Sequence, residues 1–354
     1  MNTLVIGAGP TGLTAALELA AHSVNCRIVE RRTKPSELSR AVGIMPATIK
    51  ALEPLGVAGA ILSESMPLRK IRLMRSGKTL MLLDNRSAEF RDNVIIGLPQ
   101  NRTEEILRDE LAVRHVQVEY GLAVNEITTD DQTATVRFSD NATETYDWVI
   151  AADGIQSSAR DQLGIAYPGL DLPGEWSIAD VDVGGDFDPE LVVLDIQAPG
   201  NVFTMILPIE SRRARIVSST PDALAALTQP LEIENVRRTG TFRISIRQAE
   251  TYCKGRVLLA GDAAHCHSPI GGKGMNLGMA DAVSAARAII NDQVDEYSEE
   301  RHRIGGTILK LTEAARAMVT SNNPFAKVVI WVAAKAIPSL PVVHRAFMRL
   351  LTKI

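Results

Sequence analysis

The chain has 354 residues, of which 45% are apolar and 23% charged, and its net charge is −4. These values are ordinary for a soluble globular protein of one or two domains, and the small negative charge gives no reason to expect a nucleic-acid partner. The N-terminus lacks the basic segment of a signal peptide, and no apolar run reaches the ~18–20 residues of a membrane span. Cys26, Cys253 and Cys266 follow no zinc or disulfide spacing, so a cytoplasmic protein is predicted.

The first 30 residues carry a nucleotide-binding pattern. A short apolar run at 4–6 predicts a buried parallel strand, and Gly7, Gly9 and Gly12 follow it at G-x-G-x-x-G spacing. A helical segment and a second strand come next, and that strand ends at Glu30. In such a unit the glycines allow a tight turn, a close pyrophosphate and close helix packing, and the acid accepts bonds from ribose hydroxyls. The pattern predicts a dinucleotide site but equally fits an NAD-dependent dehydrogenase.

The residues after Glu30 disfavour a dehydrogenase, because a regular βα unit does not follow. A polar, cationic loop comes first, and then a helix that is opened by Pro46 and closed at Gly56. Arg31 and Arg32 fit a solvated surface.

Two later strands also end in a glycine and an acid. The first ends at Asp153-Gly154, and the second ends at Gly261-Asp262. A glycine-rich loop and a helix from about Met275 follow the second. The "HCH" at 265–267 has no third ligand at metal-binding spacing, so no metal site is expected.

These motifs, in this order, resemble those of the flavoprotein monooxygenases of the para-hydroxybenzoate hydroxylase family. The segments "SRAVGIMPATIKALEPLGV", "LPQNRTEEILRDEL" and "FRISIRQAETYCKGRVLLAGDAAH" extend the resemblance over nearly the whole chain. It implies FAD as cofactor, NADPH or NADH as transient reductant, and O2 as co-substrate. The implied reaction is hydroxylation of an aromatic or polyketide-like small molecule through a flavin hydroperoxide.

The resemblance also implies which residues form the site. Glu30 would bind the ADP ribose, Asp262 the ribityl chain, and the helix from about Met275 would direct its N–H groups at the flavin edge that becomes negative on reduction. Three residues are expected beside the reacting ring, namely Arg40, Pro269 and Gly272. The expected cofactor-binding residues are Gly7, Gly9, Pro10, Thr11, Gly12, Glu30, Arg31, Arg40, Gln100, Asp153, Gly154, Gly261, Asp262, Pro269, Gly272, Gly274, Met275 and Asn276.

The expected fold is mixed α/β. A Rossmann-like FAD-binding domain is expected from 1–68, 98–165 and 250–295, a β-sheet substrate domain from 69–97 and 166–249, and C-terminal helices from 296–354. The substrate domain should contain a hairpin about Ser76-Gly77 and successive antiparallel strands at "EWSIADVDVGG", "LVVLDIQAP", "VFTMILPIE" and "RARIVSST".

The C-terminal segment is apolar and basic, so it fits a packed helical pair or a membrane-surface helix. Packing is favoured, because Pro338 and Pro341 break it into short pieces.

Two other classes of function compete with the monooxygenase. The first is a flavin-dependent reductase or halogenase, although only "EWSIAD" around Trp176 resembles part of the halogenase Trp-x-Trp-x-Ile-Pro motif. The second is a non-catalytic FAD or NAD sensor. The Arg40, Asp153 and Gly261-Asp262 set argues against a sensor, which needs no solvated reduced ring.

Overall fold

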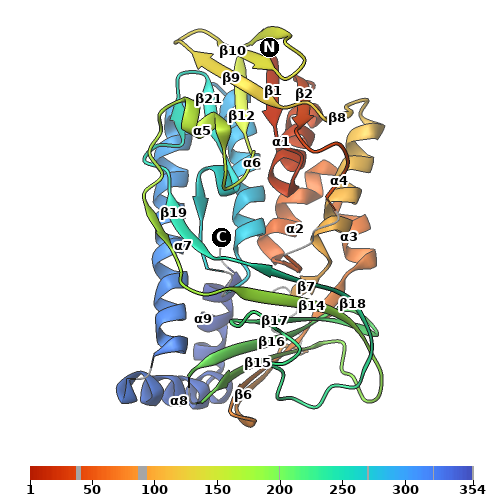
Figure 1. The fold of residues 1–354 in the computed structure, drawn as a ribbon, viewed down its shortest axis with the longest axis vertical. Coiled ribbons are helices and arrows are strands. Elements are labelled where there is room, and N and C mark those ends of the chain that lie inside the picture. The colour runs from red at the N-terminus through yellow and green to blue at the C-terminus, as the bar shows by residue number, and fades with distance from the viewer. Residues whose placement is uncertain (37–40, 87–93, 199, 269–270, 322, 353–354) are drawn as a thin grey trace.

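The fold is a mixed α/β arrangement, seen here in a computed structural model that describes residues 1–36, 41–86, 94–198, 200–268, 271–321 and 323–352. Figure 1 shows a sheet with helices in the upper half, a second sheet in the lower half, and the long helix α7 alongside both. The mixed α/β class predicted from the sequence is confirmed.

The upper sheet has six strands in the order β20-β21-β12-β1-β2-β8. β1 is parallel to β2 and β12, and β12 is parallel to β21. The carboxyl ends of these four strands therefore lie along one edge. The strands are β1 (Asn2–Ile6), β2 (Asn25–Glu30), β8 (Val118–Tyr120), β12 (Trp148–Ala151), β20 (Cys253–Lys254) and β21 (Val257–Leu259).

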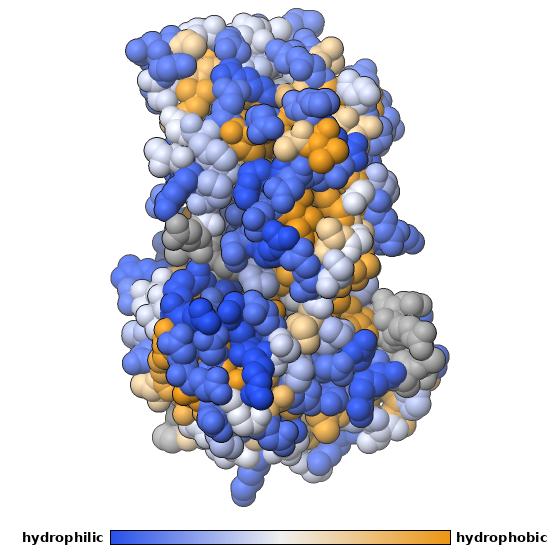
Figure 2. Space-filling model, turned by 90° about the vertical axis from the view of Figure 1, so that its right-hand side faces the viewer, coloured by the Kyte–Doolittle hydropathy of each residue, from blue (hydrophilic) through white to orange (hydrophobic). Residues whose placement is uncertain are grey.

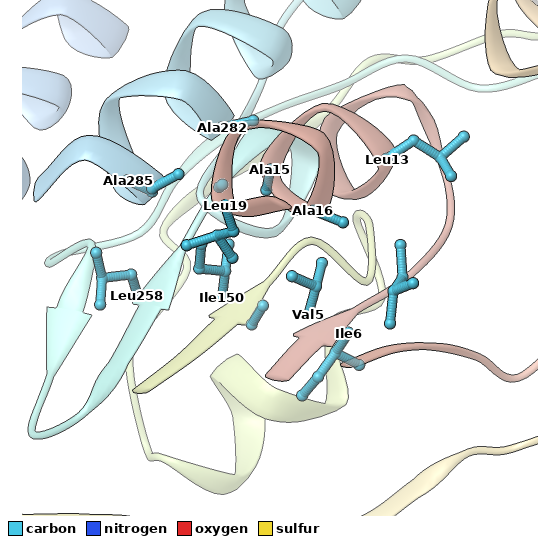
Figure 3. Close-up of a cluster of buried hydrophobic side chains, with 14 of the residues drawn as sticks. Val5, Ile6, Leu13, Ala15, Ala16, Leu19, Ile150, Leu258, Ala282 and Ala285 are labelled. Carbon is cyan, nitrogen blue, oxygen red and sulfur yellow. The ribbon is translucent and has the colours of Figure 1, made fainter. Parts of the chain in front are cut away.

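Two helices on one face of this sheet are rich in small residues where they meet. Figure 3 shows Ala15 and Ala16 of α1 (Pro10–Ala21) near Ala282 and Ala285 of α6 (Gly274–Ile290), with the apolar side chains of the sheet beneath them. All four alanines are fully buried. Because alanine has so small a side chain, the two helices pack closely, and the start of α6 is brought near the start of α1. The predicted start of α6 at about Met275 is confirmed.

Shorter elements surround this core. The helices are α2 (Pro46–Leu52), α3 (Ala58–Glu64), α4 (Gln100–Val113) and α5 (Ser158–Gln162). The helix opened by Pro46 continues as a 3-10 turn that closes at Gly56, whose φ is +85°, as predicted. Figure 2 shows the side of the molecule on which α3 and α4 lie, where hydrophobic residues are interspersed with hydrophilic ones.

Three small sheets complete the upper half and the junction with the lower sheet. Their strands are β3 (Gly43–Ile44), β7 (Ile95–Gly97) and β4 (Met66–Leu68); β9 (Val124–Thr129), β10 (Ala134–Phe138) and β11 (Thr143–Tyr146); and β13 (Gly169–Asp171), β19 (Ser245–Gln248) and β22 (His265–Cys266). The sequence analysis did not predict them as sheets.

The lower sheet has seven strands in the order β18-β14-β17-β16-β15-β5-β6. The hairpin about Ser76-Gly77 is confirmed, with φ of +46° and +78° at its two turn residues. The strands are β5 (Lys70–Arg75), β6 (Lys78–Asp84), β14 (Trp176–Val183), β15 (Leu191–Gln197), β16 (Val202–Glu210), β17 (Arg213–Ser218) and β18 (Ile233–Phe242).

The four predicted antiparallel strands all belong to this sheet, but their order in it differs from their order in the chain. β14 is not paired with the next strand, β15, but lies between β17 and β18, whereas β15 pairs in parallel with β5. Alternating apolar residues identify a strand and its buried face, but they do not say which strand lies beside it.

The chain after residue 292 is helical, as expected. It forms α7 (Val294–Thr320), α8 (Pro324–Ser339) and α9 (Pro341–Thr352). α8 and α9 pack against the β5–β6 end of the lower sheet, where Ala334, Ile337 and Met348 join a cluster with Ile71 and Leu83. In the described part of the chain no single helix is both long and apolar enough to cross a membrane, although the bent pair α8–α9 passes that test when its helices are taken together.

Candidate functional site

The acid and glycine motifs meet at one edge of the upper sheet. Gly7 follows β1, Glu30 ends β2, and Asp153 and Gly261 follow β12 and β21. At Gly7 a Cβ atom would lie 2.4 Å from the carbonyl oxygen of Ala152, and φ is +99°. Only glycine allows the ends of β1 and β12 to come this close, so the first glycine of the pattern brings two motifs together.

The start of α1 is built from the other two glycines. At Gly12 a Cβ atom would lie 1.8 Å from the carbonyl oxygen of Gly7, whereas at Gly9 no atom lies within 4 Å of the Cβ position. Gly9 precedes Pro10 and the helix start carries no side-chain cap. Its first N–H groups therefore lack intrahelical partners and can bind an anion.

Glu30 is buried and ionised at the end of β2. It accepts hydrogen bonds from the Ala8 N–H at 2.9 Å and from the Arg32 backbone N–H and guanidinium at 2.9–3.1 Å. Burial alone would raise the pKa of this carboxyl, but the bonds from Arg32 and Ala8 hold it below its ordinary value. Arg31 is exposed. Arg32, interpreted from the sequence as a surface residue, has a side chain that is 40% exposed, but its guanidinium pairs with Glu30.

Asp153 has one engaged oxygen and one orphaned oxygen. Its Oδ2 accepts from the Ala159 N–H at 3.2 Å and from Ser158 Oγ at 3.4 Å, which anchors the start of α5. Its Oδ1 is buried without a hydrogen-bond partner among the described residues. Burial raises the pKa of this carboxyl. The neighbouring Gly154 has φ of +84° and faces open space.

The Gly261-Asp262 turn packs against α1. A Cβ atom at Gly261, where φ is +63°, or at Gly278 would lie 2.6 or 2.5 Å from Thr11 Oγ1. Both glycines therefore make room for Thr11. The side chain of Asp262 is exposed at this edge.

A second group of side chains braces the turn from outside. Tyr167 Oη donates to the Asp262 carbonyl at 2.9 Å, and Arg160 donates to the Ala263 carbonyl at 3.2 Å while its guanidinium lies over the Tyr167 ring. Arg160 follows the Asp153-Gly154 motif closely in the chain, whereas Tyr167 belongs to no motif and could not be predicted from the sequence.

Behind the turn lies a buried ionic cluster that the sequence analysis also missed. The carboxylate of Asp281, on α6, pairs with His265 Nε2 at 2.5 Å and Arg301 Nε at 2.7 Å, and it accepts from the Gly261 N–H at 3.1 Å. Burial opposes the charge, but His265 and Arg301 hold the pKa of Asp281 below its ordinary value. The available signal was an acid among the small and apolar residues of a predicted helix.

Asn276 joins α6 to two other segments. Its Oδ1 accepts from the Met45 N–H at 2.8 Å and from Thr48 Oγ1 at 2.7 Å, and its Nδ2 donates to the carbonyls of Gly43 and Gly272 at 2.9 and 3.0 Å. The side chain is fully occupied by protein groups. Only the backbone N–H of Asn276 is thus left for the cofactor contact that was expected.

The glycine loop before α6 has an open backbone. Gly271 and Gly272 have φ of +98° and +62°, and nothing lies within 4 Å of either Cβ position. The N-cap of α6, Lys273, makes no side-chain cap, and Gly274 and Met275 form the first turn. Arg40 and Pro269, both expected at this site, lie outside the described residues.

Gln100 lies at the start of α4, as expected. Its Oε1 accepts from the Ala41 N–H at 3.2 Å, and its Nε2 donates to Glu104 at 2.9 Å. It thereby ties α4 to the segment that follows Arg40.

The residues present fit a bound dinucleotide with a second, neighbouring group. Open glycines and uncapped N–H groups stand at the starts of both α1 and α6, an ionised acid ends β2, and a buried carboxylate oxygen of Asp153 has no described partner. Two helix starts at one sheet edge can neutralise negative charge at two places.

Comparison with known proteins supports this interpretation. The model of the family described as "FAD binding domain" matches residues 1–235 and 219–312. The 6-methylpretetramide 4-monooxygenase of Streptomyces rimosus is 30% identical over 92% of this chain and 64% of its own length. The pentachlorophenol 4-monooxygenase of Sphingobium chlorophenolicum is 30% identical over 90% of this chain and 65% of its own length. The chain thus spans slightly less than two thirds of these relatives.

A solved structure agrees in fold. The p-nitrophenol 4-monooxygenase PnpA of Pseudomonas putida DLL-E4 superposes with a TM-score of 0.87 at 22% identity, covering 98% of this chain and 96% of that one. The matched family model, which covers most of the chain, and the motifs at the sheet edge lead to one conclusion: this protein belongs to the FAD-binding family of flavoprotein hydroxylases.

Proposed function

We propose that the protein is an FAD-dependent monooxygenase that uses NADPH or NADH and O2 to hydroxylate an aromatic or polyketide-like small molecule. The observation that carries the proposal is the meeting of Gly7, Glu30, Asp153 and Gly261-Asp262 at one sheet edge, beside the uncapped starts of α1 and α6. Bound FAD would supply the redox chemistry, accepting electrons from the nicotinamide and activating O2.

Each end of the cofactor has its own set of residues in this proposal. Glu30 binds the ADP ribose through its ionised carboxylate, and the start of α1 binds the pyrophosphate. Asp262 accepts a bond from the ribityl chain. The first N–H groups of α6 face the flavin edge that becomes negative on reduction, and their partial positive charge stabilises it.

Three residues are proposed beside the reacting ring. Arg40 positions the ring or the incoming nicotinamide, and Pro269 and Gly272 line the ring from the loop before α6. The open space at Gly272 supports a close approach of the ring to the backbone there.

Different parts of the chain have different roles in this proposal. Residues 1–68, 98–165 and 250–295 hold the cofactor, 69–97 and 166–249 hold the substrate, and 296–354 support both from outside. The printed names of two relatives, a 6-methylpretetramide 4-monooxygenase and a pentachlorophenol 4-monooxygenase, support an aromatic or polyketide-like substrate. We also propose a cytoplasmic location, which the three free cysteines support.

A coupled assay tests the proposal. Purified protein should show the visible spectrum of a flavin, and a phenolic or polyketide substrate should speed NAD(P)H oxidation. The hydroxylated product should contain oxygen from labelled O2. Replacing Gly272 by valine should leave NAD(P)H oxidation in place but release hydrogen peroxide instead of product, because a side chain would displace the ring by more than the ~0.5 Å that a productive site tolerates. Valine at Gly77, which also faces open space and has φ of +78°, is the control for backbone strain.

Other outcomes would favour the competing classes. Turnover that proceeds unchanged without O2 would favour a reductase. The rates of flavin reduction and reoxidation can be measured with a panel of phenols, quinolones and polyketides. If none of these compounds changes either rate, the result would favour a sensor.

A further inference from the structure

Helix α8 presents an apolar stripe to solvent. The most exposed member is Phe325, at 73%, and Trp331 is 55% exposed, with Val328 and Val332 at least half exposed between and beside them. These positions recur at intervals of three and four residues, so they lie on one side of the helix. The opposite side of α8 is packed, since Ala334 and Ile337 are buried against the β5–β6 end of the lower sheet.

The apolar exposure continues past the bend into α9. Leu340 and Val342 are exposed on either side of Pro341, and Figure 1 places this corner at the lower end of the molecule. Isolated exposed apolar residues are normal, but a continuous group marks a surface that binds something.

The charged side chains of this C-terminal segment have one sign. The whole chain has a net charge of −4, yet no Asp or Glu follows Glu313. Exposed cations stand on both helices, at Lys335, Arg345 and Arg349. The basic residues of this acid-free segment are Arg316, Lys327, Lys335, Arg345, Arg349 and Lys353.

We propose that the exposed face of α8 docks on an anionic phospholipid surface, with α8 lying along the membrane rather than crossing it. An aromatic and aliphatic stripe beside lysine and arginine is the composition of an interfacial helix, whose apolar face enters the headgroup boundary while its cations meet anionic lipid. Sixteen residues are too few to cross ~30 Å of hydrocarbon, and the α8–α9 pair bends by 111°.

A second copy of the chain fits this face less well. A two-fold dimer apposes a patch with itself, so the cations of α8 and α9 in one copy would be brought toward those of the other copy. Anionic headgroups instead supply the opposite charge. The proposal does not depend on the enzymatic activity.

Trp331 offers a direct readout. The other two tryptophans, Trp148 and Trp176, are buried, so Trp331 dominates any change of emission caused by surface contact. The full chain is mixed with vesicles of equal parts phosphatidylglycerol and phosphatidylcholine, or of phosphatidylcholine alone, at low and high salt. We expect co-sedimentation and a blue-shifted emission with the anionic vesicles only, both weakened by salt.

Matched variants separate the stripe from its cations. Phe325→Ser with Trp331→Ser should abolish co-sedimentation, whereas Leu62→Ser, at a half-exposed position on α3, should not change it. Lys335→Glu with Arg349→Glu should weaken binding at least about tenfold, because each cation near an anionic surface is worth about fivefold. Lys50→Glu, at an exposed position on α2, is the control.

Three results would overturn the proposal. The first is unshifted Trp331 emission without co-sedimentation. The second is equal binding to phosphatidylcholine vesicles, which would remove the anionic partner. The third is a concentration-dependent dimer that Phe325→Ser with Trp331→Ser dissociates, which would make the face a contact between two copies of this chain.

Discussion

The Gly261 N–H donates a hydrogen bond to the carboxylate of Asp281 at 3.1 Å, so a side chain of α6 holds the turn that carries Asp262. The same carboxylate binds Arg301 of α7 at 2.7 Å and His265 at 2.5 Å. α7 is thereby tied to the candidate site through one buried acid. The position of the Gly-Asp turn therefore depends on Asp281 and Arg301, which lie outside every recognised motif.

Asp281→Ala should destabilise the protein strongly, by about 3–5 kcal/mol, because it leaves the buried Arg301 without its partner. The pKa of Asp281 is depressed, so its contribution is complete above its unfolded value of 3.8 and is lost as pH falls through the lower folded value. Denaturant unfolding of wild type and variant should thus differ at neutral pH and converge in acid.

The control for Asp281 is Glu126→Gln, which breaks an exposed pair with Arg137 and should cost about 0–1 kcal/mol. Equal effects of the two substitutions would show that the buried cluster does not stabilise the fold.

Gly9 and Gly12 should respond differently to alanine. At Gly12 the new Cβ would lie 1.8 Å from the Gly7 carbonyl oxygen, so Gly12→Ala should lower the melting temperature and the yield of folded protein. At Gly9 the space is open, so Gly9→Ala should fold normally but retain less FAD, because its methyl group stands where the pyrophosphate approaches. Thermal unfolding measures the stability of the two variants, and their flavin content measures how much FAD each retains. A Gly9→Ala variant with full flavin content would move the pyrophosphate away from this turn.

Asn276→Ala should destabilise the fold through the groups it leaves unpaired. The Met45 N–H and Thr48 hydroxyl would lose their acceptor in a buried site, at roughly 1–3 kcal/mol for each orphaned group. Denaturant unfolding measures the loss. Asn276→Asp retains the acceptor but loses the two bonds donated to Gly43 and Gly272, and should therefore fall between wild type and alanine. If the alanine variant were as stable as wild type, Asn276 would not hold α6 to the segment that contains Met45 and Thr48.

Lys273 should make stability rise at alkaline pH. Burial lowers its pKa from 10.5 to about 8. Between these values the unfolded chain binds more protons than the folded one, so the free energy of unfolding increases with pH there, by up to about 3 kcal/mol. Lys273→Met should remove this rise, which denaturant unfolding near pH 8 and near pH 10 would show. The same slope in both proteins would assign the effect to other groups.

The local pattern of the sequence was sufficient for the strands that carry the motifs, for most strands of the lower sheet, and for the starts of α2 and α6. Gly7, Gly9 and Gly12 could be interpreted from spacing because each answers a local steric demand, and Glu30, Asp153 and Asp262 could be placed because each comes directly after an apolar strand. Parallel strands bring their carboxyl ends to one edge, so the meeting of these motifs followed from the elements themselves.

Only the tertiary structure decided what lies between these elements. The pairing of β14 with β17 and β18, the bracing of the Gly-Asp turn by Tyr167, and the ionic cluster of Asp281 and Arg301 all join residues far apart in the chain. Such contacts depend on which surfaces pack together, and no period or spacing encodes that. The exposed stripe of α8 belongs to the same class, because its sequence is equally apolar on the face that is buried.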